Sequence, residues 1–105
     1  MMCSNCMDEN ESVKMICEAR KYSVCDKCTV TYGKDHYGNT FFLEEEVFLK
    51  DGGNFTKLIN RPLIIDGIYI FEESMSGRMV LLRDKETNKK LTHIYDLNWL
   101  IKIKN

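Results

Sequence analysis

The chain has 105 residues, 44% of them hydrophobic and 30% charged, and a formal net charge of −1. This composition is ordinary for a globular protein and excludes a disordered one, while the small net charge excludes a protein that coats nucleic acid through bulk electrostatics. No run of about 18 apolar residues could span a membrane, and no charged segment followed by an apolar stretch begins the chain. We therefore expect a soluble, cytoplasmic protein.

Four of the five cysteines form two Cys-x-x-Cys pairs, Cys3 with Cys6 and Cys25 with Cys28. An odd number of cysteines does not suit a disulfide framework, whereas pairs separated by two residues are typical of metal sites. Zinc imposes no geometry of its own, and a tetrahedron of four thiolates satisfies it. The spacing predicts one structural zinc ion in a reducing compartment, although nickel, cobalt and iron–sulfur clusters share this ligand type.

Four protein ligands would close the coordination sphere and leave no position for an activated water. The cysteine pairs are not preceded by a His-x-Glu motif, which excludes a nucleobase deaminase. The sequence also offers no phosphate-binding glycine loop, no Ser-His-Asp order and no paired carboxylates. We predict that the metal is structural and that the protein is not an enzyme.

When Cys17 is included, the spacing Cys3-x2-Cys6-x10-Cys17-x7-Cys25-x2-Cys28 resembles a B-box zinc finger, or more generally a zinc ribbon or treble clef. The B-box is a cross-braced module with two zinc ions that mediates protein–protein contacts and self-association. The resemblance implies that the two Cys-x-x-Cys pairs form the first zinc site and that Cys17 begins the second.

The second site of the B-box pattern is incomplete in this chain. Arg20 stands where the next ligand belongs, and arginine does not coordinate zinc because it stays protonated. Cys17 and His36 are the candidate additional ligands. The alternatives are that Cys17 is a small buried residue of a hairpin and that His36 is an exposed loop residue.

Residues 29–39 are polar, include two glycines and read as a loop, which ends a predicted zinc-binding module over residues 1–39. In residues 40–50, Thr40 is a candidate N-cap and Gly52-Gly53 a stop signal, which slightly favours a helix. The alternative is a hairpin that pairs residues 41–50 with residues 55–59 across a turn at 51–54.

From Leu63 onward, short β-rich runs alternate with turn signals, which predicts a small antiparallel sheet or barrel within a domain over residues 40–105. The order of the runs and the glycine-aromatic start at 67–71 are similar to the SH3-like barrels of many short bacterial and phage proteins. Such barrels bind peptides, RNA or other proteins, so this resemblance does not determine the function.

Four aromatic and five basic residues of the second half are candidates for a binding surface, in which rings stack on a ligand beside positive charges. They are Tyr69, Phe71, Tyr95 and Trp99, with Arg78, Arg83, Lys85, Lys89 and Lys90. The alternative is that the aromatic residues form the core of the sheet and that the basic residues serve solubility.

The charges are distributed unevenly, because residues 1–46 hold five basic and nine acidic residues and the remainder holds ten basic and seven acidic ones. The first half therefore carries −4 and the second +3. Three of the acidic residues are consecutive, at 44–46, and they form either a solvated face or an acidic contact surface for a basic partner.

Together these features predict a small α+β protein, mostly β, in which an N-terminal one-zinc finger packs on a C-terminal antiparallel SH3-like sheet or barrel. We expect a protein–protein interaction module that acts as an adaptor, inhibitor or regulator of a larger assembly, with self-association as a further expectation. The alternatives are a nucleic-acid-binding accessory protein of transcription or translation, and a thiol sensor in which Cys17 attacks the zinc site. Richness in Asn, Lys and Ile suggests the AT-rich genome of a phage or other virus, which would place the protein in the host cytoplasm.

Overall fold

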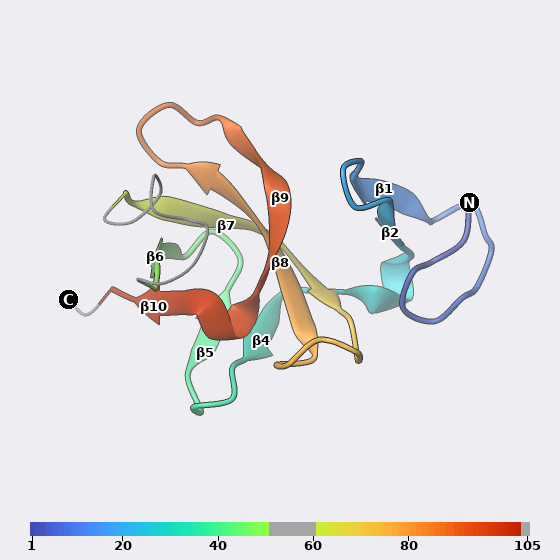
Figure 1. Ribbon diagram of the computed structural model, residues 1–105, viewed down its shortest axis with the longest axis horizontal. Coiled ribbons are helices and arrows are strands. Elements are labelled where there is room, and N and C mark those ends of the chain that lie inside the picture. The colour runs from blue at the N-terminus through green and yellow to red at the C-terminus, as the bar shows by residue number, and fades with distance from the viewer. Residues whose placement is uncertain (51–60, 104–105) are drawn as a thin grey trace.

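The computed structural model describes residues 1–50 and 61–103, and within them the regular structure consists almost entirely of strands (Figure 1). The strands are β1 (Lys14–Cys17), β2 (Tyr22–Val24), β3 (Thr29–Val30), β4 (Tyr32–Lys34), β5 (Thr40–Phe42), β6 (Glu46–Leu49), β7 (Leu63–Ile70), β8 (Arg78–Asp84), β9 (Lys90–Asp96) and β10 (Leu100–Lys102). Two single-turn 3₁₀ helices, η1 (Asp26–Cys28) and η3 (Leu97–Trp99), accompany them. In this part of the chain no helix has the length and apolar character needed to cross a membrane.

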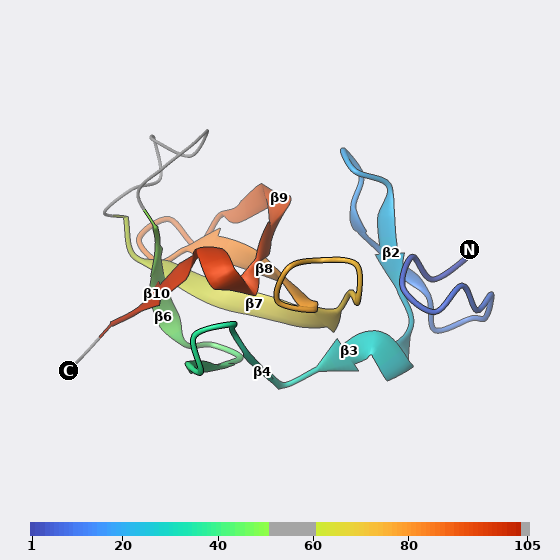
Figure 2. The same cartoon turned by 60° about the horizontal axis from the view of Figure 1, so that its bottom comes forward.

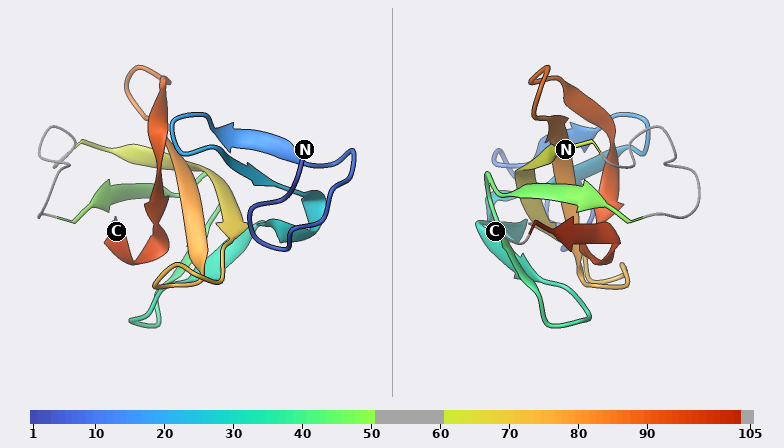
Figure 3. Two further views of the ribbon diagram at one scale, coloured as in Figure 1. Left: turned by 45° about the vertical axis from the view of Figure 1, so that its right-hand side comes forward. Right: turned by 90° about the vertical axis from the view of Figure 1, so that its left-hand side faces the viewer.

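The largest sheet is antiparallel and has the strand order β10-β6-β7-β8-β9, with β3 as its sixth strand. β7 organises this sheet, because β8 pairs along its whole length while β6 and β3 pair with its two ends: β6 with Leu63 and Ile64, and β3 with Ile68 and Tyr69. Two separate hairpins, β1–β2 and β4–β5, complete the fold. The predicted antiparallel sheet is confirmed, and within the described residues it curls without closing into a barrel (Figure 3).

The long strands bury side chains on both faces. The inner face forms a first core with the neighbouring strands and η3, made of Phe41, Val47, Leu49, Leu63, Ile65, Ile68, Val80, Leu82, Tyr95, Leu97 and Leu100. Ile65 and Ile68 reach the same face although they are three residues apart, because the pairing register of β7 shifts between Ile65 and Gly67. Beyond this bulge, Tyr69 points to the opposite face.

The outer face of β7, β8 and β9 is covered by residues 1–28, which lie to one side of the sheet (Figure 2). This second core joins Val24, Tyr22 and the buried cysteines to Tyr69 and Ile94. The ring of Tyr22 meets that of Phe71 edge to face, with centroids 5.1 Å apart. The cysteine-rich segment is therefore packed on the sheet rather than attached by a linker.

The helix predicted for residues 40–50 is wrong, because this segment forms β5, a turn and β6. Val47 and Leu49 are buried while Glu46 and Phe48 are half-buried, a period of two that suits a strand packed on a core. The alternative hairpin stays a prediction, and in the described residues β6 pairs with β7 and β10. Its expected partner segment, 55–59, lies outside the described residues.

The division of the chain at residues 1–39 and 40–105 stays a prediction. Two pairings cross this boundary, because β3 pairs with β7 and β4 pairs with β5. Residues 29–34, predicted as a loop, thus form strands that connect the cysteine-rich segment to the large sheet.

The three consecutive glutamates at 44–46 form ion pairs with the more basic second half of the chain. Each has a basic partner from the second half of the chain: Glu44 pairs with Arg83, Glu45 with Lys102 at 3.6 Å, and Glu46 with Lys85. Three acidic residues of the first half are therefore paired with basic residues of the second half.

Candidate metal centre

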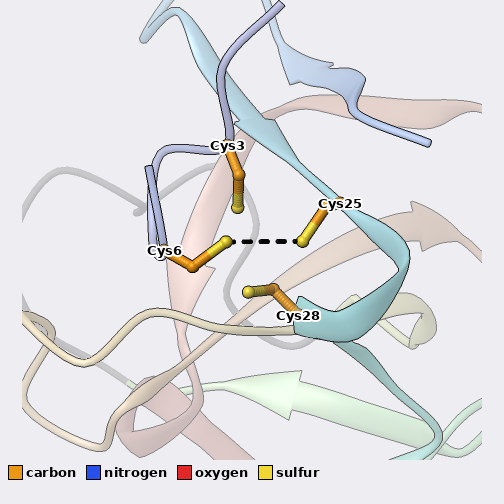
Figure 4. A group of neighbouring side chains, drawn as sticks. All are labelled: Cys3, Cys6, Cys25 and Cys28. Carbon is orange, nitrogen blue, oxygen red and sulfur yellow. Dashed lines mark hydrogen bonds between the residues drawn. The ribbon is translucent and has the colours of Figure 1, made fainter. Parts of the chain in front are cut away.

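Two tight turns present the cysteine pairs to each other. In the first turn, the N–H of Met7 donates to the carbonyl of Cys3 at 3.0 Å, and Met7 adopts a left-handed φ of 67°. The second turn is η1, in which the N–H of Cys28 donates to the carbonyl of Cys25 at 3.1 Å. A hydrogen bond of 2.7 Å from the N–H of Ser4 to the carbonyl of Ser23 fastens the first turn to β2. The four thiols consequently point toward a common centre (Figure 4).

The sulfur atoms of Cys3, Cys6, Cys25 and Cys28 all lie within 4.8 Å of one another, so the four residues could hold a metal ion. A tetrahedral zinc with bonds of about 2.3 Å sets its sulfur ligands about 3.8 Å apart. The Sγ atoms of Cys6 and Cys25 are 3.6 Å apart. The donor set and its spacing thus fit a tetrahedral four-sulfur site.

The electrostatics of the four thiols also favour a cation. For Cys3, burial is outweighed by the N–H groups of Cys6 and Cys25, which lower the pKa of its thiol to about 6. For Cys6, the N–H of Asp8 lowers the pKa of the thiol, but burial and the neighbouring sulfurs outweigh this effect and raise the pKa to about 12. Burial raises the pKa of Cys28. Four adjacent thiolates therefore need a positive ion between them.

Asn5, between the first two ligands, links the centre to the sheet. Its Nδ2 donates to the Sγ of Cys28 at 3.3 Å, and its Oδ1 accepts from the N–H of Glu72 at 3.0 Å, in the loop between β7 and β8. Groups that hydrogen-bond to metal ligands orient those ligands and tune the site. Sequence reasoning missed this role, because nothing in a Cys-Ser-Asn-Cys turn identifies which loop the asparagine reaches.

The two candidate additional ligands do not join the four-cysteine cluster. Cys17 is buried in β1, and its thiol donates to the carbonyl of Thr92 at 3.2 Å. His36 is exposed in the turn between β4 and β5, where its N–H donates to Oδ1 of Asn98 at 2.7 Å. Within the described residues, Cys17 is therefore a buried residue of the hairpin and His36 an exposed loop residue, as the alternative predictions state.

The predicted aromatic binding surface is wrong for Tyr69 and Tyr95. Tyr69 and Tyr95 are 8% and 1% exposed, because the sheet buries both of its faces and uses these rings in its two cores. Phe71 is half-buried against Tyr22, and Trp99, 37% exposed, meets Tyr95 edge to face. These four rings do not share one accessible surface.

Most of the predicted basic residues have partners within the chain. Arg83 donates to Asp66 at 2.8 Å as well as to Glu44, Lys85 pairs with Glu46, and Lys90 lies 3.6 Å from Asp66. Arg78 donates from Nη1 to the carbonyl of Gly77, and its Nε is buried without a hydrogen-bond partner among the described residues. Lys89 is exposed beside Lys90.

A different set of aromatic residues is exposed. Tyr32, Tyr37 and Phe42 of the β4–β5 hairpin are 59%, 71% and 52% exposed. The rings of Tyr32 and Phe42 face each other across the hairpin with centroids 6.2 Å apart, and Nζ of Lys50 lies 4.1 Å from the ring centre of Tyr37. The turn residues Asp35, Gly38 and Asn39, flanked by aromatic residues, were the signal that could have identified this hairpin.

Comparisons with protein-family models, with curated proteins and with solved structures gave no match to the chain.

Proposed function

We propose that the chain is a non-catalytic protein–protein interaction module whose N-terminal part is stabilised by one structural zinc ion. Cys3, Cys6, Cys25 and Cys28 would hold the ion, and their four sulfurs would leave no position for a reacting water. The metal would supply folding free energy to residues 1–28, which are too few to form a stable core without a metal or another partner. The B-box and SH3-like resemblances belong to this proposal.

The observation that carries the interaction role is a set of exposed methionines on the segments around the metal centre. Met1, Met2 and Met7 of the cysteine-rich segment are 59%, 48% and 63% exposed. Met75, 74% exposed, lies in the β7–β8 loop that Asn5 contacts through Glu72. Flexible, polarisable methionines are used at adaptable protein-binding surfaces, and leaving four of them in water has no benefit for an isolated domain.

The test is capture of a protein partner by the immobilised, zinc-loaded chain from a lysate of its source cell. We expect one stoichiometric partner whose recovery falls when Met7→Glu and Met75→Glu are combined. A Lys34→Glu variant, changed at an exposed residue of the β4–β5 hairpin, is the control. Recovery of no stoichiometric partner by the zinc-loaded protein would contradict the proposal.

The exposed β4–β5 hairpin favours a second candidate function, binding of single-stranded nucleic acid. Aromatic faces can stack on bases while lysines contact phosphates, and Nζ of Lys102 lies 5.9 Å from the ring centre of Phe42. Fluorescence anisotropy with labelled oligouridine and oligothymidine at low salt tests this candidate. We expect Tyr32→Ala with Phe42→Ala to abolish any binding, and absence of binding by the unaltered protein at low salt would eliminate the candidate.

A further inference from the structure

A groove of about 430 Å³ separates the cysteine-rich segment from the large sheet. One wall is made by residues 14–16 of β1 and the other by residues 90–92 of β9, while Asp66, Tyr69 and Leu81 contribute from β7 and β8. β1 and β9 belong to segments far apart in the sequence but neighbouring in space (Figures 1 and 3). The groove is distinct from the metal centre, because none of the four clustered cysteines lines it.

The walls of the groove are strand edges. Three consecutive residues of each strand line the groove, and the pairing of both strands is irregular there, between Met15 and Cys17 in β1 and opposite Leu81 to Arg83 in β9. Among the described strands, β1 pairs only with β2 and β9 only with β8, which leaves the facing edges of β1 and β9 without a β partner. Unpaired strand edges offer backbone N–H and C=O groups, and an extended peptide is the ligand that satisfies a row of them.

A hydrogen bond links the two walls of the groove at one end of β1. The thiol of Cys17, at the end of β1, donates to the carbonyl of Thr92 on β9, and this contact joins the two strands. The lining itself contains the apolar side chains of Met15, Leu81 and Leu91. Alternate side chains of an inserted strand would therefore meet an apolar surface while its backbone meets the edges.

The charges at the groove select an acidic ligand. Lys14 is exposed on one wall and has no ion pair among the described residues. On the other wall Lys90 is 77% exposed, 3.6 Å from Asp66. The carboxylate of Asp66 is already bound by Arg83 at 2.8 Å, so it does not neutralise Lys90 fully. The two walls thus present positive charge on either side of a floor that contains Leu81, Tyr69 and the ion-paired carboxylate of Asp66.

Besides the carboxylate of Asp66, the floor contains the hydroxyl of Tyr69. The ring is held in the second core, 8% exposed, and the hydroxyl lies over Gly67, where an added Cβ would come within 2.2 Å of it. This hydroxyl makes no hydrogen bond within the described residues. It is positioned to donate to a carbonyl or carboxylate oxygen in the groove.

We propose that the groove between β1 and β9 binds an extended peptide segment of a partner protein by strand addition, with an acidic side chain between Lys14 and Lys90 and apolar side chains against Leu81 and Leu91. This inference rests on the proposed function, because it specifies the form in which the protein partner is recognised. The peptide bridges the cysteine-rich segment and the sheet, so its binding requires the assembled, zinc-loaded chain.

The experiment selects short random peptides displayed on phage against the zinc-loaded full chain. Enriched sequences are then synthesised with a fluorescent label, and their affinities are measured by anisotropy. We expect enriched peptides to contain an acidic residue flanked by apolar or β-branched residues. Combining Lys14→Glu with Lys90→Glu should weaken their binding about tenfold or more. A matched charge change at exposed positions outside the groove, Lys21→Glu with Lys34→Glu, should change it less than about twofold.

Backbone amide chemical shifts locate the bound peptide independently of the variants. We expect the largest changes at Lys14–Ile16 and Lys90–Thr92, together with slower hydrogen exchange of their amides. The proposal is overturned if no peptide is enriched, if the enriched peptides bind the double variant as tightly as the unaltered chain, or if the shifts concentrate on the β4–β5 hairpin. It is also overturned if labelled oligonucleotides, rather than peptides, protect the groove amides.

The same variants separate this inference from the proposed function. If the partner captured from lysate binds the Lys14→Glu/Lys90→Glu chain normally, the interaction role stands and the groove is not its site. If no partner is captured but acidic peptides bind the groove, the groove is a peptide site and the methionine-based interaction role fails.

Discussion

The molecule contains two cores on opposite faces of the large sheet, and their chemistry differs. The inner core is built of large aliphatic and aromatic side chains and holds no cysteine, whereas four of the nine buried residues of the outer core are cysteines. Burial of aliphatic groups stabilises by itself, but a buried thiol cluster does so chiefly once a cation binds it. The inner core therefore explains why the sheet folds, and with the proposed zinc site the outer core would make the attachment of residues 1–28 dependent on metal.

Removal of the metal should produce the largest effect and affect the two cores unequally. Structural zinc contributes on the order of 10 kcal/mol to the folding of small metal modules. With a strong chelator, or in Cys28→Ser, we expect amides of β1 and β2 to exchange rapidly while those of β7 and β8 stay protected, as measured by hydrogen exchange.

The control for this experiment is Cys17→Ser, which alters a buried thiol outside the four-cysteine cluster. This variant should retain one zinc ion per chain by elemental analysis. Equal loss of protection in both cores on chelation would show that they form a single cooperative unit and would contradict the comparison.

The adjacent residues Leu81 and Leu82 compare the two faces directly. Leu82 is fully buried in the inner core, and Leu81 is half-buried at the edge of the outer one. Leu82→Ala should lower the free energy of unfolding by about 2 to 5 kcal/mol, because it leaves a cavity in a packed core. Leu81→Ala should cost less, since its site is partly solvated. Urea denaturation of the two zinc-loaded variants measures the difference, and an equal or reversed order would contradict it.

Asn5→Ala tests how closely the metal centre is coupled to the sheet. The variant removes the hydrogen bond to Cys28 and the acceptor for the N–H of Glu72. Loss of a ligand-orienting group typically weakens metal affinity by about tenfold or more. Competition with a chromophoric chelator measures the affinity, and Asn10→Ala, in the loop after the first two ligands, is a matched control. Unchanged affinity would mean that Asn5 only connects loops.

The smallest effect concerns the pH dependence of the sheet. Asp84 is buried, which by itself raises the pKa of its carboxyl, but the N–H groups of Thr87 and Glu86 and the guanidinium of Arg61 lower that pKa below its usual value. Because the carboxyl is more acidic in the folded state, it stabilises the sheet above its unfolded pKa, and this contribution is lost as the pH falls through the folded value.

We expect the urea midpoint of Asp84→Asn to fall less steeply with acidification than that of the unaltered chain. The comparison is made between neutral pH and about pH 3, below the ordinary pKa of an aspartate. Parallel profiles for the two proteins would show that another group dominates the acid sensitivity of the sheet.

The parts of this structure that could be predicted from the sequence depend on local spacing. The Cys-x-x-Cys pairs need only two tight turns and a hairpin to meet, and the alternating runs after Leu63 form the predicted antiparallel sheet. The helix prediction for residues 40–50 failed because three glutamates and a candidate N-cap suit a helix. The strand partners of β6 include Leu63 and Leu100, which lie far along the chain.

The prediction of an aromatic binding surface failed for a related reason. Tyr69 reads as a sheet residue that could face solvent, and its burial depends on Tyr22 and Val24, which pack there from the other end of the sequence. The groove was not predicted because its walls come from β1 and β9, whose proximity is a property of the whole fold.

The central position of β7 has a consequence for synthesis on the ribosome. The four clustered thiols leave the exit tunnel before β7, which pairs with β3, β6 and β8 and follows only after residue 60. A metal ion could bind these thiols early, but the apolar surface around Val24 and Tyr22 stays uncovered until Tyr69 and Ile94 have been translated. During that interval, the growing polypeptide exposes the surface on which chaperones act.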